Sequence, residues 1–237
     1  MKREELPPVA RAFLAVTFTI TIGLGALLWS FHPRSTGPAE FLWITALGML
    51  AHAFPIRASR HQAYQVTLPF IIIAAALFSI PQLAAFLLLI HAAEQLRVRR
   101  PLHIQLFNFC DYFLSAAAAA VFFQRAVALM PASALSSVEA AMAAGCTFIV
   151  LNRVLLAGAL WTARGLSPAR SGLFRPELLA ADLVIIWISG PMLVLSSQAG
   201  AWMVLVTAGP LCLARPALAA MLALPRRSTG EAPARAA

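Results

Sequence analysis

Long apolar stretches separated by short polar or basic stretches run along most of this chain. The apolar stretches are residues 12–31, 41–56, 66–96, 104–127, 138–163, 177–198 and 200–224. A stretch of about 20 apolar residues is long enough to cross the hydrocarbon core of a bilayer as a helix. The pattern therefore predicts an all-α fold, a polytopic integral membrane helical bundle whose polar stretches are its loops.

The stretch 66–96 is too long for one crossing. A single helix of this length would measure about 46 Å, whereas the hydrocarbon core is about 30 Å thick. Basic residues, which are typical of cytoplasmic loops, flank it on both sides: Arg57, Arg60, Arg97, Arg99 and Arg100. The chain must therefore leave and return, so we predict a short hairpin, 66–80 and 81–96, broken before Pro81, that need not reach fully across.

Counting this hairpin as two gives about eight apolar segments with both termini in the cytoplasm. Most arginines then lie on the cytoplasmic side, and the tryptophans near segment ends lie at the membrane interfaces, where aromatic residues gather. We expect residues 1–11 to form a cytoplasmic N-terminus, 12–224 a single transmembrane helical bundle domain, and 225–237 a disordered cytoplasmic tail.

Composition supports the membrane assignment. Only 11% of the 237 residues are charged, against about 25% in soluble domains, and the mean hydropathy is +0.81. The net charge of the chain is +9. In a membrane protein, such an excess of basic residues usually marks cytoplasmic loops and contact with anionic lipid. No basic stretch is interleaved with stacking aromatic residues, so we expect no nucleic-acid partner.

Five polar residues inside the predicted spans are the candidate site: Asn108, Asp111, Asn152, Arg153 and Asp182. A carboxylate at membrane depth costs about 2.5–3.5 kcal/mol on insertion scales, so it should face protein, a partner or water. All three charged residues belong to the inner half of the membrane, where Arg153 can pair with Asp111 or with Asp182. A bundle-locking ion pair, a ligand or ion site and a proton relay all remain open, and the asparagines fit either interhelical hydrogen bonds or ligand contacts.

The other reactive side chains are scattered. The three cysteines lie in apolar segments without CxxC spacing, which indicates packed residues rather than a disulfide or metal site. Among the five histidines, His91 stands one helical turn before Glu94, and polar residues at the membrane interface explain this pair better than a metal site. No nucleotide-binding or hydrolase motif occurs. We therefore expect no enzyme, no cofactor and no metal.

Three stretches resemble a known membrane region. They are QVTLPFIIIAAALFSIPQLAAFLLLIHAAEQLRVRRPLHIQLFNFCDYFLSAAAAAVFF, FIVLNRVLLAGAL and TAGPLCLARPAL, within residues 65–218. Together they resemble the multi-span N-terminal membrane (sensor) region of bacterial signalling proteins that carry HD-GYP or GGDEF output domains. The resemblance implies a sensory or ligand-binding module. Only residues 225–237 follow the last span, so output would come from a separate partner, or the chain has another role.

We therefore expect a non-catalytic membrane sensor-like module that binds a small ligand or a partner's helices within the bundle. The alternative is a small-solute transporter, or the substrate-binding membrane subunit of one. The expected location is the inner (plasma) membrane. A cytoplasmic signalling partner or anionic lipid would contact the basic loops through Arg97, Arg99, Arg100, Arg164 and Arg170. The sequence leaves the ligand and the oligomeric state open.

Overall fold

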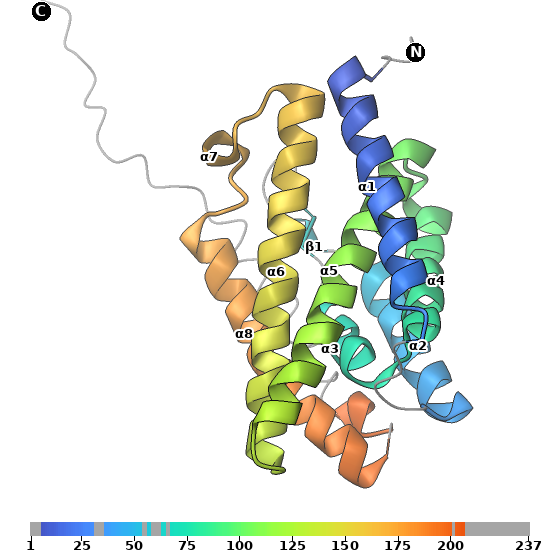
Figure 1. Cartoon of the computed structure of the whole chain (residues 1–237), viewed down its shortest axis with the longest axis vertical. Coiled ribbons are helices and arrows are strands. Elements are labelled where there is room, and N and C mark those ends of the chain that lie inside the picture. Colours follow the sequence, from blue (N-terminus) through green and yellow to red (C-terminus); the bar gives the residue numbers. More distant parts are fainter. Residues whose placement is uncertain are drawn as a thin grey trace, which may run out of the picture.

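The computed structural model describes residues 6–30, 36–53, 56–57, 63–64, 67–200 and 202–206. Its helices are α1 (Pro8–Leu27), α2 (Pro38–Ala53), α3 (Leu68–Leu77), α4 (Ile80–Val98), α5 (Leu102–Leu129), α6 (Ala134–Arg164), α7 (Pro168–Ser171) and α8 (Pro176–Ala199) (Figure 1). Two strands of two residues each, β1 (Ile56–Arg57) and β2 (Ala63–Tyr64), pair antiparallel between α2 and α3. The structure thus confirms the helical class.

Four of the described helices are long and apolar enough to cross a membrane: α1, α5, α6 and α8. This supports a helical membrane protein. Helices α2 and α3 have 16 and 10 residues, so the count of eight segments stays a prediction, as does the side on which the termini lie. Most of the predicted last segment, 200–224, and both predicted terminal segments except residues 6–11 lie outside the described residues.

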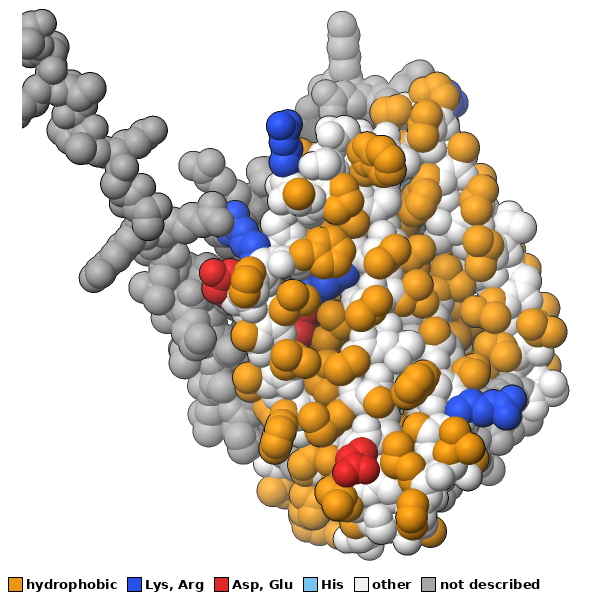
Figure 2. Space-filling view, turned by 60° about the vertical axis from the view of Figure 1, so that its left-hand side comes forward, with side chains coloured by type: hydrophobic (Ala, Val, Ile, Leu, Met, Phe, Trp, Pro, Cys, Tyr) orange, Lys and Arg blue, Asp and Glu red, His pale blue; other side chains and the backbone are white. Residues whose placement is uncertain are grey.

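The surface of the bundle fits a lipid environment. Figure 2 shows apolar side chains over most of one face, with few charged side chains among them. Large apolar residues on the long helices are exposed, among them Val150 and Val154 of α6 and Val184 and Trp187 of α8. Water would oppose such a surface, whereas hydrocarbon accepts it. The exposed residues therefore agree with the membrane assignment.

Helix α5 lies at the centre of the bundle and packs against α1, α3, α4 and α6. Helix α6 also packs against α8, and α2 packs against α4. In Figure 1 the start of α1, the end of α4 and the end of α6 lie at the same, upper end. The two basic loops, after α4 and after α6, therefore share one end of the bundle.

Helix α3 is a short helix enclosed by protein. Its residues 68–76 are all buried, and ten residues span only about 15 Å, half of a hydrocarbon core. It packs mainly against α5 and α8 and only slightly against α4. The chain therefore breaks where we predicted, but the two arms do not pair as a hairpin. The alanine- and isoleucine-rich sequence of α3 has no polar face, so the other helices surround it.

The break between α3 and α4 is built from local hydrogen bonds. The Ser79 backbone N–H donates to Gln82 Oε1 at 3.0 Å, and the Gln82 backbone N–H donates to Ser79 Oγ at 3.4 Å. Pro81 occupies the first turn of α4, where a backbone N–H is not needed. The Thr36 hydroxyl donates to the Leu77 carbonyl, which the end of α3 leaves open. Pro81 therefore starts a helix, and Thr36 satisfies a backbone group exposed by the break.

Small residues allow the central helices to approach closely. Ala116, Ala117, Ala119 and Ala120 of α5 are completely buried. On α8, a Cβ at Gly190 would lie 2.7 Å from Val138 Cγ1 and 3.2 Å from Val138 Cα. The second contact is with backbone, which cannot rotate away. Gly190 therefore sets the distance between α6 and α8.

We expect Gly190→Ala to destabilise the protein, by about 1–3 kcal/mol, because the added methyl group overpacks this contact. Gly23→Ala on α1 is the matched control, since a Cβ there meets no atom within 4 Å and alanine favours the helix. The measurement is the midpoint of thermal unfolding in detergent. Equal midpoints for the two variants would contradict the close approach.

Candidate functional site

Two groups of polar side chains are buried in the bundle. We call Asp111, Asn152, Arg153 and Asp182 the arginine–aspartate cluster, and His52, His91 and Glu94 the histidine–glutamate cluster. The sequence predicted the first as a candidate site. It did not predict the second.

In the arginine–aspartate cluster, Arg153 of α6 pairs with Asp182 of α8. Arg153 Nε donates to Asp182 Oδ2 at 3.1 Å, and Arg153 NH2 donates to the same oxygen. Arg153 NH1 donates to the Leu173 carbonyl, between α7 and α8. One guanidinium thus joins α6, α8 and the segment that connects them. Asp182 is one of the two partners that the sequence allowed.

The Asp111 carboxylate of α5 has a different partner. Its side chain is buried, with the residue 2% exposed, and Asp111 Oδ2 accepts a hydrogen bond from Asn152 Nδ2 at 2.9 Å. Ser115 Oγ donates to Asp111 Oδ1 at 3.5 Å. Asn152 therefore ties α6 to α5, while the next residue, Arg153, ties α6 to α8.

The predicted site thus divides into two pairs. Asn108 is half-buried on the turn before Asp111, and the described residues give it no hydrogen bond to either pair. Arg153 and Asn152 each donate hydrogen bonds to other groups of this chain. The geometry favours the bundle-locking interpretation over an open ligand site for these residues.

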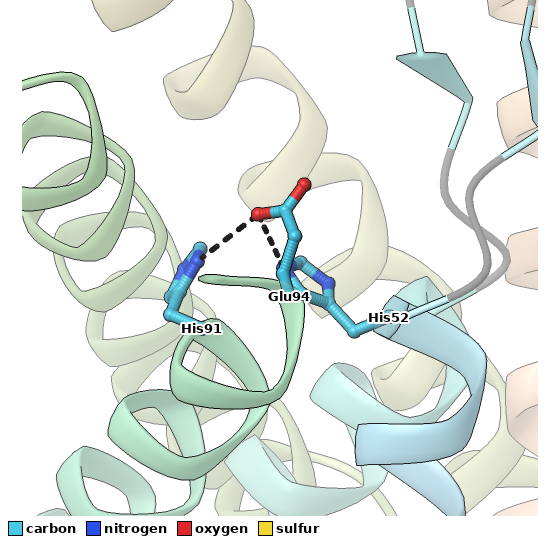
Figure 3. A group of neighbouring side chains, drawn as sticks. All are labelled: His52, His91 and Glu94. Carbon is cyan, nitrogen blue, oxygen red and sulfur yellow. Dashed lines mark ion pairs between the residues drawn. The ribbon is translucent and has the colours of Figure 1, made fainter. Parts of the chain in front are cut away.

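The histidine–glutamate cluster joins α2 to α4. His52 lies in the last turn of α2, and His91 and Glu94 lie one turn apart on α4. All three are buried, with exposed fractions of 0%, 3% and 0%. His52 Nε2 is 3.5 Å and His91 Nδ1 is 3.9 Å from Glu94 Oε2. Figure 3 shows that both imidazoles approach the same carboxylate oxygen.

Neighbouring side chains hold the cluster in place. Thr67, just before α3, lies with Oγ1 3.2 Å from His52 Nδ1. The ring of Tyr112 on α5 packs at right angles to both imidazoles, with centroids 5.6 Å from His52 and 5.0 Å from His91. The cluster is therefore enclosed by α2, α4, α5 and the start of α3.

Arg100 reaches the cluster because the chain reverses at the end of α4. Arg99 adopts a left-handed conformation, with φ of 51°. The Gln95 side chain then donates to the Arg100 carbonyl at 2.8 Å and accepts from the Arg100 N–H at 3.0 Å. This folds Arg100 back, and its NH2 lies 3.0 Å from Glu94 Oε1. The arginine binds one carboxylate oxygen, while the other faces the histidines.

These contacts leave hydrogen-bonding nitrogens of both imidazoles without a partner among the described residues. His52 Nε2 and both ring nitrogens of His91 have no hydrogen-bond partner within the described part of the chain. Buried polar atoms without a partner are uncommon, and they often indicate a functional site or a bound ion or water. Two imidazoles and a carboxylate are also side chains that bind metal ions. This cluster is therefore the stronger candidate site.

His91 and Glu94 are buried within the protein, and their placement at the depth of the membrane interface stays a prediction. Their spacing of one helical turn was visible in the sequence, but His52 was not associated with them. The only sequence signal that could have linked it is that α2 and α4 both end beside basic loops.

Comparisons with family models, curated proteins and solved structures found no match to this chain. The resemblance to the membrane region of HD-GYP and GGDEF signalling proteins therefore stays a prediction.

We expect Arg153→Ala to destabilise the bundle by about 3–5 kcal/mol, because it leaves the Asp182 carboxylate buried without its cation. The double variant Arg153→Met with Asp182→Leu should recover most of this loss, since neither member of the pair then remains as a buried charge. Glu139→Ala, which removes an exposed carboxylate on α6, is the control. Thermal unfolding in detergent measures all three, and a double variant no more stable than Arg153→Ala would refute the pairing.

Proposed function

We propose that this chain is a non-catalytic membrane protein that binds a small ligand inside its helical bundle and responds to it as a sensor. One observation carries the proposal. His52 and His91 are buried beside Glu94 with ring nitrogens that lack hydrogen bonds within the described part of the chain.

Such an arrangement favours ligand binding on energetic grounds. A buried polar group without a partner costs about 1–3 kcal/mol. A ligand that bonds to the imidazole nitrogens removes this penalty. The arginine–aspartate cluster offers no comparable gain, because Arg153 and Asn152 already donate to groups of the chain. The ligand site therefore moves from the residues predicted by sequence to the end of α2 and α4.

The surroundings of Glu94 support a sensor. Arg100 contacts Glu94 and belongs to the basic loop between α4 and α5. A ligand that draws Glu94 toward the histidines changes the position of the carboxylate that holds Arg100. Ligand binding can then shift the conformation of the loop where we expect a cytoplasmic partner or anionic lipid. The arginines here are Arg97 in the last turn of α4, and Arg99 and Arg100 in the loop itself.

A transporter of a small solute remains the second candidate. The short, enclosed helix α3 favours it, because discontinuous helices at membrane depth often form binding sites in transporters. Helix α3 ends at Leu77, and α4 begins at Ile80 after the capped break at Ser79.

Native mass spectrometry of the protein purified in mild detergent tests ligand binding. We expect a bound mass that denaturation releases, and that the double variant His52→Ala with His91→Ala loses. The exposed His103→Ala is the matched control and should retain the mass. A wild-type protein that carries no such mass would contradict the proposal.

Limited trypsin digestion separates the sensor from the transporter. We expect the rate of cleavage after Arg97 and Arg99 to differ between ligand-retaining protein and protein from which the ligand has been removed; the Arg100–Pro101 bond resists trypsin. Cleavage after Arg170, which lies between α6 and α8, should stay the same. Equal rates in the first loop, together with solute uptake by proteoliposomes, would favour the transporter.

A further inference from the structure

We infer that the ligand is a divalent transition-metal ion of the zinc or iron class, bound by His52 Nε2, His91 Nδ1 and Glu94 Oε2. This rests on the proposed function, because the metal ion would be the small ligand. It depends on the geometry of the three ligand atoms, on their chemistry and on the side chains around them.

The three ligand atoms have nearly the spacing that a metal ion requires. All lie within 4.8 Å of one another, and two of the separations are 3.5 Å and 3.9 Å. A tetrahedral ion with bonds of about 2.0–2.1 Å places its ligands about 3.3 Å apart. The known separations exceed this by only about 0.2 and 0.6 Å. The remaining separation is at most 4.8 Å, so binding of one ion requires the three side chains to draw together.

The donor set selects the class of metal. Calcium and magnesium prefer sites built from oxygen atoms, whereas two of these three donors are imidazole nitrogens. Among the described residues, no cysteine belongs to the cluster, which disfavours copper(I). Two histidines and a carboxylate suit zinc, iron(II) and related ions. Three protein ligands also leave a coordination position for water or a second group.

The neighbours of the ligands orient them toward one point. Thr67 Oγ1 lies 3.2 Å from His52 Nδ1, so Nε2 of that ring faces Glu94. Tyr112 packs against both imidazoles and restricts their rotation. Such outer contacts fix the orientation of metal ligands in proteins. Apart from Glu94 itself, the contacts from Thr67 and Tyr112 leave Nε2 of His52 and Nδ1 of His91 available.

Arg100 affects the affinity of the histidine–glutamate cluster for a metal ion. Arg100 NH2 lies 3.0 Å from Glu94 Oε1. The other carboxylate oxygen, Oε2, faces the two histidines (Figure 3). The positive charge of Arg100, whose side chain is 31% exposed, repels a second cation nearby and so weakens metal binding. We expect reversible binding rather than permanent incorporation, which is what a sensor of metal ions requires.

The test is titration of the whole protein, stripped with a chelator, in detergent. Zn²⁺ binding is measured by calorimetry, and Co²⁺ serves as the probe whose visible absorption reports nitrogen and oxygen ligation. We expect one ion per chain. His91→Ala and Glu94→Gln should weaken binding more than tenfold, and Thr67→Val, which alters only the outer contact, about tenfold. His103→Ala is the control, with unchanged affinity.

The outcomes separate the two proposals. If neither ion binds, but native mass spectrometry finds another bound mass that depends on His52 and His91, the metal inference is overturned and the ligand-binding function stands. If no bound species is found at all, both fail. Equal Zn²⁺ affinity in wild type, Glu94→Gln and Thr67→Val also overturns the inference, because the ion would then bind elsewhere. Thr67→Val retains the three ligands, so it gives an answer even if Glu94→Gln does not fold.

Discussion

The whole bundle depends on one constraint: a polar group enclosed by apolar helices must find its partner on another helix, because neither hydrocarbon nor the core can solvate it. Arg153 meets this requirement through Asp182 of α8 and the Leu173 carbonyl. Asp111 meets it through Asn152. These bonds fix α6 against both α5 and α8. The residues whose burial costs the most free energy are therefore the ones that hold the long helices together.

Such partners meet only where the backbones come close. The alanine run of α5 and Gly190 of α8 remove side-chain bulk from the helix contacts, and small residues are the usual means of close approach in membranes. Close packing also encloses α3. This helix packs against α5, α6 and α8 more than against α4, its neighbour in sequence. Packing and polar pairing thus depend on each other here.

The two buried clusters differ in what they leave available. In the arginine–aspartate cluster, the cation and the amide both donate to groups of the chain, so it serves the structure. In the histidine–glutamate cluster, nitrogen atoms of His52 and His91 have no hydrogen-bond partner among the described residues. Arg100 connects this second cluster to the basic loop after α4. Ligand binding and a response at the end of the bundle can therefore be parts of one mechanism.

The sequence by itself determined the helical membrane class and the break before Pro81, because both follow from local hydropathy, helix length and capping residues. It also identified Asp111, Arg153 and Asp182 as buried groups that need partners. Only the tertiary structure decided that Arg153 pairs with Asp182, that Asp111 pairs with Asn152, and that His52 joins His91 and Glu94. The physical reason is that these helices are apolar on nearly all sides, so their sequences do not show which face is turned toward which neighbour.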